Sequence, residues 1–261
     1  MIMTSSAAQP NTVALFISDL HLQTALPRTT QAFFDFIEQY AVHTSRLYLL
    51  GDIFEYWAGD DDIDTPYHRS IVDALHSLVA RGVELYWIAG NRDFLAGSGF
   101  SAATGATMLQ DGHVISLAGR TITLAHGDAQ CTDDTAYMAF RAQVRQPAWQ
   151  QQFLSMPLVQ RKAIIEGVRQ TSKDAGKEKA TGIMDVNAAA IDALFTQSAT
   201  QVLIHGHTHR PALHVEQVGD QQRLRYVLSD WEYDVTPARG GWISLTEDGA
   251  LHRFDAQGKL L

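Results

Sequence analysis

Residues 13–21, with the sequence VALFISDLH, contain the pattern that decides the fold. The apolar half is too short for a helix and is rich in β-branched and aromatic side chains, which indicates a strand buried on both faces. The second half is polar, so side chains able to bind a ligand begin where the strand ends. The chain repeats this design at residues 47–52, 85–93, 122–128 and 201–209.

Helical patterns separate the first three of these strands. Apolar residues recur at helical spacing between Phe33 and Tyr40, and again between Ile71 and Val79. An alternation of strand and helix predicts parallel strands joined by right-handed crossovers. Ligands of open α/β sheets bind beyond the carboxyl ends of the strands, so we expect the polar strand ends to converge on one site.

The second half of the chain changes character. Residues 132–195 follow a helical pattern, broken at Pro147 and Pro157. Their Gly- and Lys-rich part, residues 173–181, predicts a loop between helices. The C-terminal runs alternate in polarity, which predicts antiparallel strands of a second sheet layer. We therefore predict an α/β sandwich of two mixed β-sheets flanked by helices, a single domain over residues 1–261 with residues 132–195 inserted as a lid over the site.

Composition excludes several classes of protein. The chain has 261 residues, of which 46% are hydrophobic and 19% charged, and one cysteine. It is long enough to bury a core and lacks the bias of collagen-like, low-complexity or coiled-coil chains. One cysteine excludes a disulfide framework and cysteine-rich zinc or iron–sulfur sites. No apolar run approaches the roughly 18 residues of a spanning helix and no signal peptide is evident, so we expect a cytosolic protein.

The net charge of −9, taken alone, argues against a polyanionic partner such as nucleic acid. The charge is uneven, however, because residues 137–180 contain eight basic and three acidic side chains. A solvated helix face is one interpretation. We favour a surface that attracts anionic lipid headgroups and a diphosphate, and we expect Arg161 and Lys162 to belong to it.

Seven side chains at the predicted strand ends offer oxygen or imidazole donors and no thiolate. They are Asp19, His21, Asp52, Asn91, His126, His207 and His209. One divalent cation rarely needs more than about six donors, so this set predicts two cations that share a bridging carboxylate, for which Asp52 is the natural candidate. The mixed donors suit Mn, Fe or Zn better than Ca or Mg. Two such cations bind a phosphoryl group and activate water, which predicts hydrolysis at phosphorus.

Other residues near these motifs have plainer interpretations. His205 shares the period-2 spacing of His207 and His209, so spacing does not choose among the three. Residues 60–62 form an acidic run that we interpret as a solvated turn, and Cys131 is interpreted as a neutral, packed thiol. The apolar side chains of the helical segment form either an acyl-chain groove or simple interhelical packing. These are Tyr137, Phe140, Trp149, Phe153, Met156 and Leu158.

The strand-end motifs together resemble the calcineurin-like metallophosphoesterases. Longer runs are similar to the UDP-2,3-diacylglucosamine hydrolases of lipid A biosynthesis, and they occupy residues 51–62, 90–95, 126–128, 131–134 and 205–211. The resemblance extends from about Leu15 to Trp231. It implies the calcineurin-like sandwich, and it selects His207 and His209, leaving His205 outside the ligand set.

The resemblance also implies a site and a reaction. It implies two Mn²⁺ ions, one held by Asp19, His21, Asp52 and His209, the other by Asp52, Asn91, His126 and His207. Water would attack the α-phosphorus of UDP-2,3-diacylglucosamine and release UMP and 2,3-diacylglucosamine 1-phosphate. The matching catalytic positions are Asp52, Asn91, Arg92 and His126. The matching substrate contacts are Asn91, Arg92, Asp134, Ser172, Gly176, Lys179 and His207; Gly176 stands where the family usually has Asn and offers no side chain.

A lipid substrate implies a peripheral protein on the cytoplasmic side of the inner membrane. We expect no nucleic-acid partner and no obligate protein partner. The nearest alternative is a metallophosphoesterase that acts on another nucleotide or phosphodiester. A non-catalytic metal-binding scaffold is the alternative from a different class, and the complete donor set argues against it.

Arg92 follows Asn91 at a position where many members of the wider superfamily have histidine. Arginine stays charged at any working pH and cannot act as a general acid. The leaving group must then depart without a proton, which a sugar 1-phosphate does better than a simple alkoxide. We expect Arg92 to bind phosphate charge and to favour a pyrophosphate over an ordinary phosphodiester.

Overall fold

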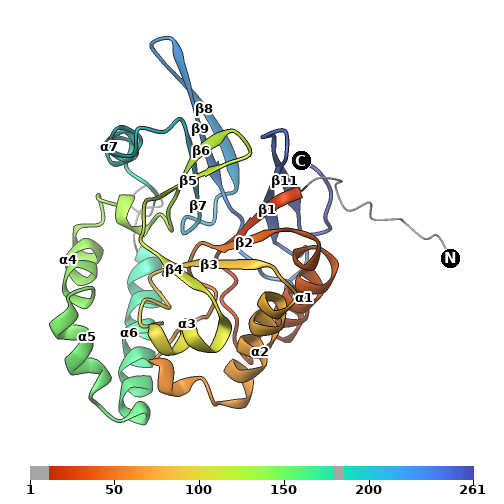
Figure 1. Ribbon diagram of the computed structural model, residues 1–261. Helices are drawn as coiled ribbons and strands as arrows, with labels where there is room; N and C mark the ends of the chain where they lie inside the picture. Colours follow the sequence, from red (N-terminus) through yellow and green to blue (C-terminus); the bar gives the residue numbers. More distant parts are fainter. Residues whose placement is uncertain (1–11, 179–184) are drawn as a thin grey trace.

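Two mixed β-sheets form the centre of the computed structural model, which describes residues 12–178 and 185–261. The first sheet has six strands in the order β11-β10-β1-β2-β3-β4, and the second has five in the order β5-β6-β7-β9-β8. Figure 1 shows the two sheets and the helices around them. The strands are β1 (Thr12–Ile17), β2 (Arg46–Leu49), β3 (Glu84–Ile88), β4 (Thr107–Leu109), β5 (His113–Leu117), β6 (Arg120–Leu124), β7 (Val202–His205), β8 (Ala212–Val218), β9 (Gln221–Val227), β10 (Gly241–Thr246) and β11 (Leu251–Asp255). The predicted sandwich is confirmed.

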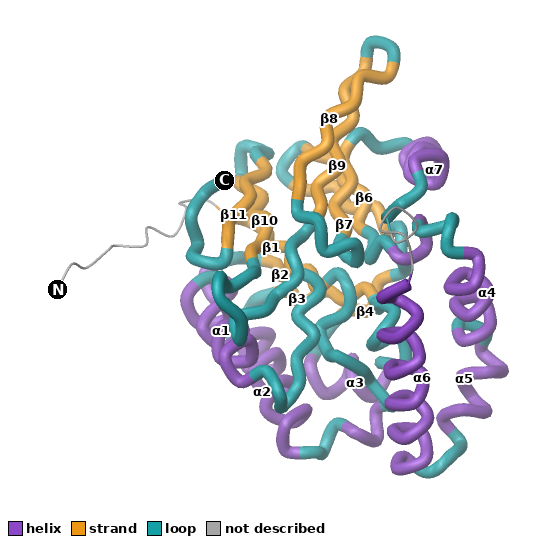
Figure 2. The backbone as a smooth tube through the Cα atoms, turned by 180° about the vertical axis from the view of Figure 1, so that it is seen from behind, coloured by secondary structure: helices purple, strands orange, loops and turns teal. Residues whose placement is uncertain are grey.

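Helices pack on the outer faces of both sheets, with α1 to α3 against the first sheet and α7 against the second. Figure 2 shows the same layers from behind, with α4, α5 and α6 grouped on the side away from the C-terminus. The α-helices are α1 (Pro27–Gln39), α2 (Pro66–Ala80), α3 (Ser98–Thr104), α4 (Thr135–Val144), α5 (Pro147–Leu154), α6 (Leu158–Glu178) and α7 (Ala188–Ser198). Short 3₁₀ turns are η1 (Ala41–His43), η2 (Asp60–Asp62) and η3 (Asp128–Gln130).

Strand β1 is buried on both faces, as its sequence predicts. Leu15 and Ile17 pack in the core beneath α1 and α2, whereas Ala14 and Phe16 pack in the core between the two sheets. Successive side chains of a strand point to opposite faces, so an uninterrupted apolar run serves a strand with a core on each side.

The parallel pairing of β1, β2 and β3 is confirmed. The assignment of all C-terminal strands to a second layer is wrong in part. Strands β8 and β9 form an antiparallel pair in the second sheet, but β10 pairs with β1 and brings β11 into the first sheet. The reason is that alternation in a sequence identifies the buried face of a strand, whereas the pairing partner is set by contacts across the whole fold.

The helical segment follows the predicted breaks. The side chain of Asp134 caps α4 by accepting a hydrogen bond from the Tyr137 N–H, and Pro147 begins α5. Helix α6 begins after Pro157 and continues to Glu178, so the loop predicted at residues 173–181 is wrong over its first six positions. A single glycine costs a helix only about 1 kcal/mol, and the Lys, Glu and Ala around Gly176 favour helix. The remaining part of that predicted loop lies outside the described residues.

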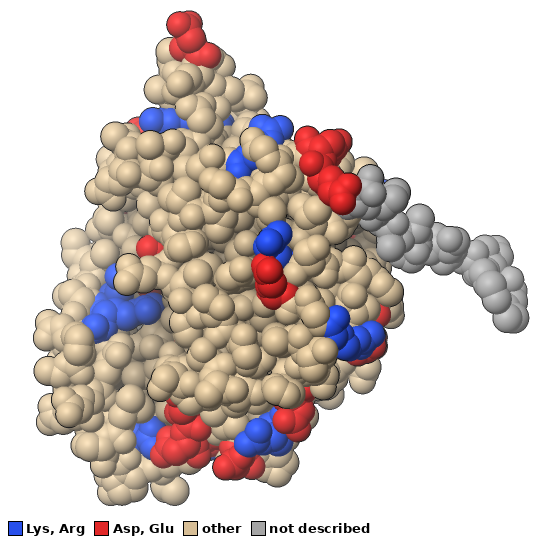
Figure 3. Space-filling view, in the orientation of Figure 1, with Lys and Arg blue, Asp and Glu red and all other residues tan. Residues whose placement is uncertain are grey.

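The predicted surface position of Arg161 is wrong, and the acidic run at residues 60–62 is solvated only in part, because Asp61 is exposed whereas Asp62 is buried. Arg161 is 1% exposed; its guanidinium donates to the Ala58 carbonyl and pairs with Asp61. Lys162 Nζ lies 2.6 Å from Asp62 Oδ1, and Asp62 is fully buried. The acidic run is therefore the docking site of α6, because the carboxylates of Asp61 and Asp62 neutralise Arg161 and Lys162. Figure 3 shows groups of opposite sign side by side at the centre, right and lower edge of one face, whereas a group of Lys and Arg at the left stands apart.

Asp60, in the same acidic run, caps the start of α3 instead of pairing with α6. Its carboxylate accepts hydrogen bonds from the backbone N–H groups of Gly97 and Gly99 at the start of α3, at 3.1 and 2.8 Å. Carboxylates stabilise helix N-termini because the first N–H groups have no partner within the helix.

Some side chains of the candidate acyl-chain groove are buried in the core and others are exposed to solvent. Phe153 is buried in the core of the first sheet and stacks on Trp149 with ring centroids 4.9 Å apart, whereas Phe140 is 40% exposed. Within residues 12–178 and 185–261, no helix has both the length and the apolar character that crossing a membrane requires.

Candidate metal centre

Five of the seven predicted donors have a left-handed backbone conformation. Their φ angles are 54° at Asp19, 49° at His21, 53° at Asp52, 69° at His207 and 54° at His209. Residues other than glycine adopt this conformation at an energetic cost, and such strain concentrates at functional sites. Backbone hydrogen bonds hold the strained turns: the Asp19 N–H donates to the Gly51 carbonyl and the His21 N–H to the Asp52 carbonyl, both at 3.0 Å.

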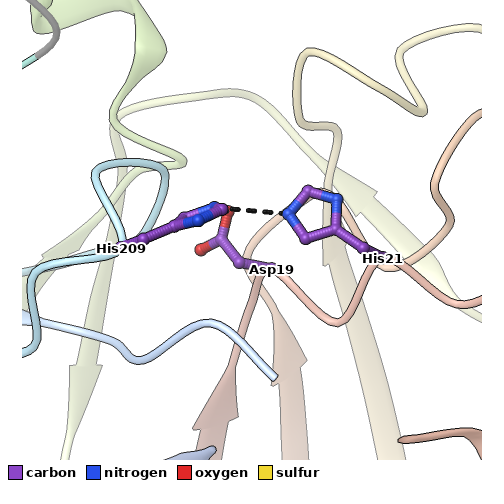
Figure 4. Close-up of side chains that lie close together, drawn as sticks. All are labelled: Asp19, His21 and His209. Carbon is purple, nitrogen blue, oxygen red and sulfur yellow. Dashed lines mark hydrogen bonds and ion pairs between the residues drawn. The ribbon is translucent and has the colours of Figure 1, made fainter. Parts of the chain in front are cut away.

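The first cluster consists of Asp19, His21 and His209 (Figure 4). The Nε2 atoms of the two histidines lie 3.3 Å apart, and His209 Nε2 lies 3.5 Å from Asp19 Oδ1. Asp19 follows β1 in the first sheet, whereas His209 follows β7 in the second. The cluster therefore joins the two sheets at their carboxyl ends.

The second cluster consists of Asp52, His126 and His207. His126 Nε2 lies 3.7 Å from Asp52 Oδ1 and 3.0 Å from Asn91 Oδ1, so the amide of Asn91 faces the same point. The rings of His126 and His207 meet edge to face with centroids 5.1 Å apart. The structure thus brings all seven predicted donors into two clusters, and Asp52 belongs to the second of them.

The two clusters are connected through Asp19. Its Oδ2 accepts hydrogen bonds from the His207 N–H at 2.9 Å and from Ser18 Oγ at 2.5 Å. Two glycines permit this close approach of loops. A Cβ on Gly206 would lie 2.2 Å from Asp19 Oδ2, and a Cβ on Gly90 would lie 2.2 Å from Asp52 Oδ1.

Three of the histidines direct their second ring nitrogen toward an oxygen outside the clusters. His126 Nδ1 lies 2.8 Å from the Leu50 carbonyl, and His21 Nδ1 lies 3.1 Å from Glu55 Oε2. His209 Nδ1 is 3.9 Å from Asp230 Oδ2. The His126 contact is a hydrogen bond of the kind that fixes the free N–H of metal-binding histidines, and His21 and His209 have a carboxylate near the corresponding nitrogen.

The electrostatics of the clusters suit cations. Burial lowers the pKa of His126, but the carboxylates of Asp52 and Asp19 outweigh it and raise this pKa to about 9. Burial likewise raises the pKa of Asp19, but the neighbouring imidazoles of His209, His126 and His21 hold it well below its usual value. Asp19 Oδ1 is buried and, among the described residues, has no hydrogen-bond partner. Ionised carboxylates facing imidazoles and an unpartnered oxygen fit a divalent cation in each cluster.

The predicted catalytic arginine lies against the second cluster. The Arg92 N–H donates to Asp52 Oδ1 at 2.8 Å, and Arg92 Nη1 lies 3.3 Å from Glu55 Oε1. Asp134 lies at the start of α4, where Tyr137 stacks on His207 with ring centroids 6.2 Å apart.

Three predicted substrate contacts have little or no structural description. Ser172 and Gly176 lie on the backbone of α6, whose side chains are not described from residue 170 onward. Lys179 lies outside the described residues.

Sequence reasoning missed the contacts by which α4 holds the loops of the centre. Tyr137 Oη donates to Asp128 Oδ2 at 2.6 Å, and Arg141 Nε donates to the same oxygen at 2.8 Å. Arg145 Nη2 donates to the Gly90 carbonyl at 2.8 Å. The only available signal was the excess of basic residues in this segment, which gives no pairing partners. Glu55 was also missed, although it lies inside the long motif at residues 51–62.

His205 and Cys131 take the plainer interpretations. His205 is 1% exposed and its Nε2 faces Arg225 Nη1 at 3.1 Å, so it belongs to neither cluster. Burial raises the pKa of the Cys131 thiol to about 12, and its Sγ lies 3.7 Å from the Gly127 carbonyl. A thiol in this state is neutral and packed.

Comparisons with known proteins agree with this geometry. The model of the calcineurin-like phosphoesterase family matches residues 13–211. A UDP-2,3-diacylglucosamine hydrolase from Chromohalobacter salexigens is 46% identical over 240 residues, which cover 92% of this chain and 95% of the relative. One from Aromatoleum aromaticum is 49% identical over 221 residues, covering 85% and 90%.

Among solved structures, a dimetal phosphatase from Danio rerio aligns with a TM-score of 0.47 at 13% identity, covering 94% of this chain and 96% of that one. The family match spans both clusters, and the two hydrolases match the chain over most of its length. The chain therefore belongs to the calcineurin-like phosphoesterases and, within them, to the family of the UDP-2,3-diacylglucosamine hydrolases.

Proposed function

We propose that this enzyme hydrolyses the pyrophosphate bond of UDP-2,3-diacylglucosamine, with water attacking the α-phosphorus to give UMP and 2,3-diacylglucosamine 1-phosphate. The observation that carries the proposal is the pair of adjacent clusters, Asp19–His21–His209 and Asp52–His126–His207. Relatives named UDP-2,3-diacylglucosamine hydrolase, 46% and 49% identical, support the substrate. This reaction belongs to the synthesis of lipid A.

Two Mn²⁺ ions are the proposed cofactors. The first would be held by the first cluster with Asp52, and the second by the second cluster with Asn91, so that Asp52 would contribute to both sites. Such a pair supplies positive charge for the phosphoryl oxygens and a nucleophilic hydroxide near neutral pH. The mixed imidazole, amide and carboxylate donors support Mn²⁺ over Ca²⁺ or Mg²⁺.

The protein's own residues position the substrate. We assign Arg92 to the phosphate charge, since its guanidinium is 32% exposed and lies between Asp52 and Glu55. Because it cannot donate a proton at working pH, the leaving sugar phosphate departs as an anion. Asn91, Asp134 and His207 remain the proposed substrate contacts on this side, with Ser172, Gly176 and Lys179 at the far end of α6.

Isotope labelling tests the reaction. The purified enzyme is incubated with Mn²⁺ and UDP-2,3-diacylglucosamine in H₂¹⁸O, and both products are analysed by mass spectrometry. Attack at the α-phosphorus places one ¹⁸O in UMP and none in the sugar phosphate. Label in the sugar phosphate contradicts the assigned phosphorus. Equal turnover of bis-alkyl phosphodiesters contradicts the role of Arg92 and favours the alternative of a general phosphodiesterase.

We also propose that residues 1–261 form one domain with a helical insert at about residues 132–195. Helices α4 and α6 contact the loops of the centre through Arg141, Arg145 and Arg169, which supports a lid that folds with the rest of the domain. Helix α7 supports the single domain in another way, because Ile191 and Phe195 pack on the second sheet.

Peripheral attachment to the cytoplasmic surface of the inner membrane completes the proposal, with no nucleic-acid partner and no obligate protein partner. Arg161 and Lys162, which were expected at the lipid surface, instead pair with Asp61 and Asp62. We therefore propose that the exposed apolar side chains of α4 to α6 contact the membrane. They are Phe140, Leu154, Val159, Ile164 and Val168.

Vesicle sedimentation tests the membrane contact. Val159→Ser with Ile164→Ser is expected to lower binding to phosphatidylglycerol-containing vesicles several-fold, because apolar area no longer enters the interface. Val215→Ser on β8, where the side chain is 54% exposed, is the matched control and is expected to bind normally. Equal binding by all three proteins contradicts the contact.

A further inference from the structure

Glu55 lies at a point where three parts of the proposed centre meet. It is 7% exposed. Its Oε2 atom lies 3.1 Å from Nδ1 of His21, which belongs to the first cluster. Its Oε1 atom lies 3.3 Å from Arg92 Nη1 and also accepts a hydrogen bond from Arg169 Nη2. One carboxylate oxygen thus faces a histidine, and the other faces two guanidiniums.

The partners of Glu55 come from separate segments of the fold. His21 follows β1, Arg92 follows β3, and Arg169 is on α6. The Arg169 guanidinium also lies 5.5 Å from the centroid of the Tyr56 ring, which holds it on the face of the segment that carries Glu55. Glu55 is therefore a direct link between α6 and the first cluster.

Each contact has a physical purpose. A histidine that binds a cation through Nε2 is oriented and made more basic by a carboxylate on Nδ1. Two neighbouring guanidiniums repel each other, and a carboxylate between them keeps them together. The trio of Glu55, Arg92 and Arg169 retains a net positive charge, which favours a phosphate oxygen nearby.

We propose that Glu55 is a positioning residue, which orients His21 for cation binding and holds the guanidiniums of Arg92 and Arg169 side by side at the substrate phosphate. This inference rests on the proposed dinuclear centre. Glu55 itself touches neither the cation nor the phosphate in this role; it acts through the three side chains that it contacts.

The test compares Glu55→Gln with wild type and with Glu38→Gln. Glutamine keeps the size of Glu55 and removes its charge. Glu38 is the matched control, because both of its carboxylate oxygens lie 2.9 Å from Arg81 Nη1 on the exposed surface. Mn²⁺ binding to the apoprotein is measured by titration calorimetry, inorganic phosphate binding by competition, and KM and kcat with the lipid substrate.

The expected result for Glu55→Gln is a loss of about 10- to 100-fold in the affinity of one Mn²⁺ per chain, with weaker phosphate binding and a raised KM. Glu38→Gln should match wild type. If wild type binds fewer than two Mn²⁺ per chain, the proposed function is wrong. If wild type binds two and Glu55→Gln equals it in Mn²⁺ affinity and KM, only the role of Glu55 is wrong.

A purely structural role for Glu55 predicts a different outcome, in which the urea midpoint falls and Mn²⁺ affinity does not. That result overturns the inference. Glu55→Asp provides the second variant in case Glu55→Gln does not fold. Its carboxylate is one methylene too short to reach His21 and both arginines together, so Mn²⁺ affinity at least about threefold below wild type supports the role, and unchanged affinity contradicts it.

Discussion

The sheet side and the helix side of the centre are built in different ways. On the sheet side, the donors lie two to four residues beyond a strand, and backbone hydrogen bonds such as His21 N–H to the Asp52 carbonyl hold them. On the helix side, α4 and α6 reach the centre through arginine side chains that pair with Asp128 and Glu55, and α6 also docks through the pair of Arg161 and Asp61. Short covalent connections therefore fix the donors, whereas long side chains and charge fix the helices.

The largest expected effect is a loss of hydrolysis when a donor of the sheet side is removed. Asp52→Ala removes the proposed bridging carboxylate, so hydrolysis of the lipid substrate should fall by about 1,000-fold or more. Bound Mn²⁺ per chain, measured by elemental analysis, should fall as well. Asp35→Ala, on the exposed face of α1, is the control and should retain full activity. Unchanged hydrolysis by Asp52→Ala would show that the centre is not catalytic.

A smaller loss of Mn²⁺ binding is expected when a methyl group is added between the loops of the sheet side. Gly90→Ala places a Cβ 2.2 Å from Asp52 Oδ1, so the carboxylate must move and Mn²⁺ affinity should fall by about 10- to 100-fold. Gly167→Ala on α6 is the matched control, because its Cβ would meet nothing within 4 Å. It should keep Mn²⁺ affinity and stabilise the helix by up to about 1 kcal/mol. Normal Mn²⁺ binding by Gly90→Ala would contradict the close packing of the loops.

The helix side should respond in stability. Arg161→Met leaves the Ala58 carbonyl and Asp61 without their buried partner, so the free energy of unfolding in urea should fall by about 2 kcal/mol. Arg69→Met removes a guanidinium that pairs with Asp64 on the exposed surface and should cost less than about 1 kcal/mol. Equal losses in the two variants would show that α6 is not docked through Arg161.

The smallest expected effect is a pH-dependent change in folding stability. Burial raises the pKa of Asp62, but hydrogen bonds from His68 and Lys162 outweigh it and hold this pKa below its usual value. A lowered folded-state pKa stabilises the protein above the unfolded value of about 4, and the benefit is lost as the pH falls through the folded value. Asp62→Asn should therefore be about 1 kcal/mol less stable at pH 7, with a difference that shrinks below about pH 4. Asp64→Asn, at an exposed site, is the control and should cost less stability at pH 7 than Asp62→Asn.

The sequence predicted the sheet side well because that side is local. An apolar run followed by polar residues is visible in any one segment, and the five predicted strand ends do meet. The bridging position of Asp52 stays a prediction, since its carboxylate is grouped with His126 and His207. The helix side was predicted poorly, because the excess of basic residues does not reveal that Arg161 faces Asp61, a hundred residues earlier.

The sequence by itself determined the strands, the donors at their ends and the helical segment between β6 and β7, since hydrophobic period and strand-end polarity are properties of neighbouring residues. Only the tertiary structure decided that β10 and β11 join the first sheet, that α6 continues to Glu178, and that Arg161 turns inward. These outcomes depend on which distant groups satisfy a strand edge or a buried charge. Glu55 belongs to this second class, because its importance appears only when His21, Arg92 and Arg169 are brought around it.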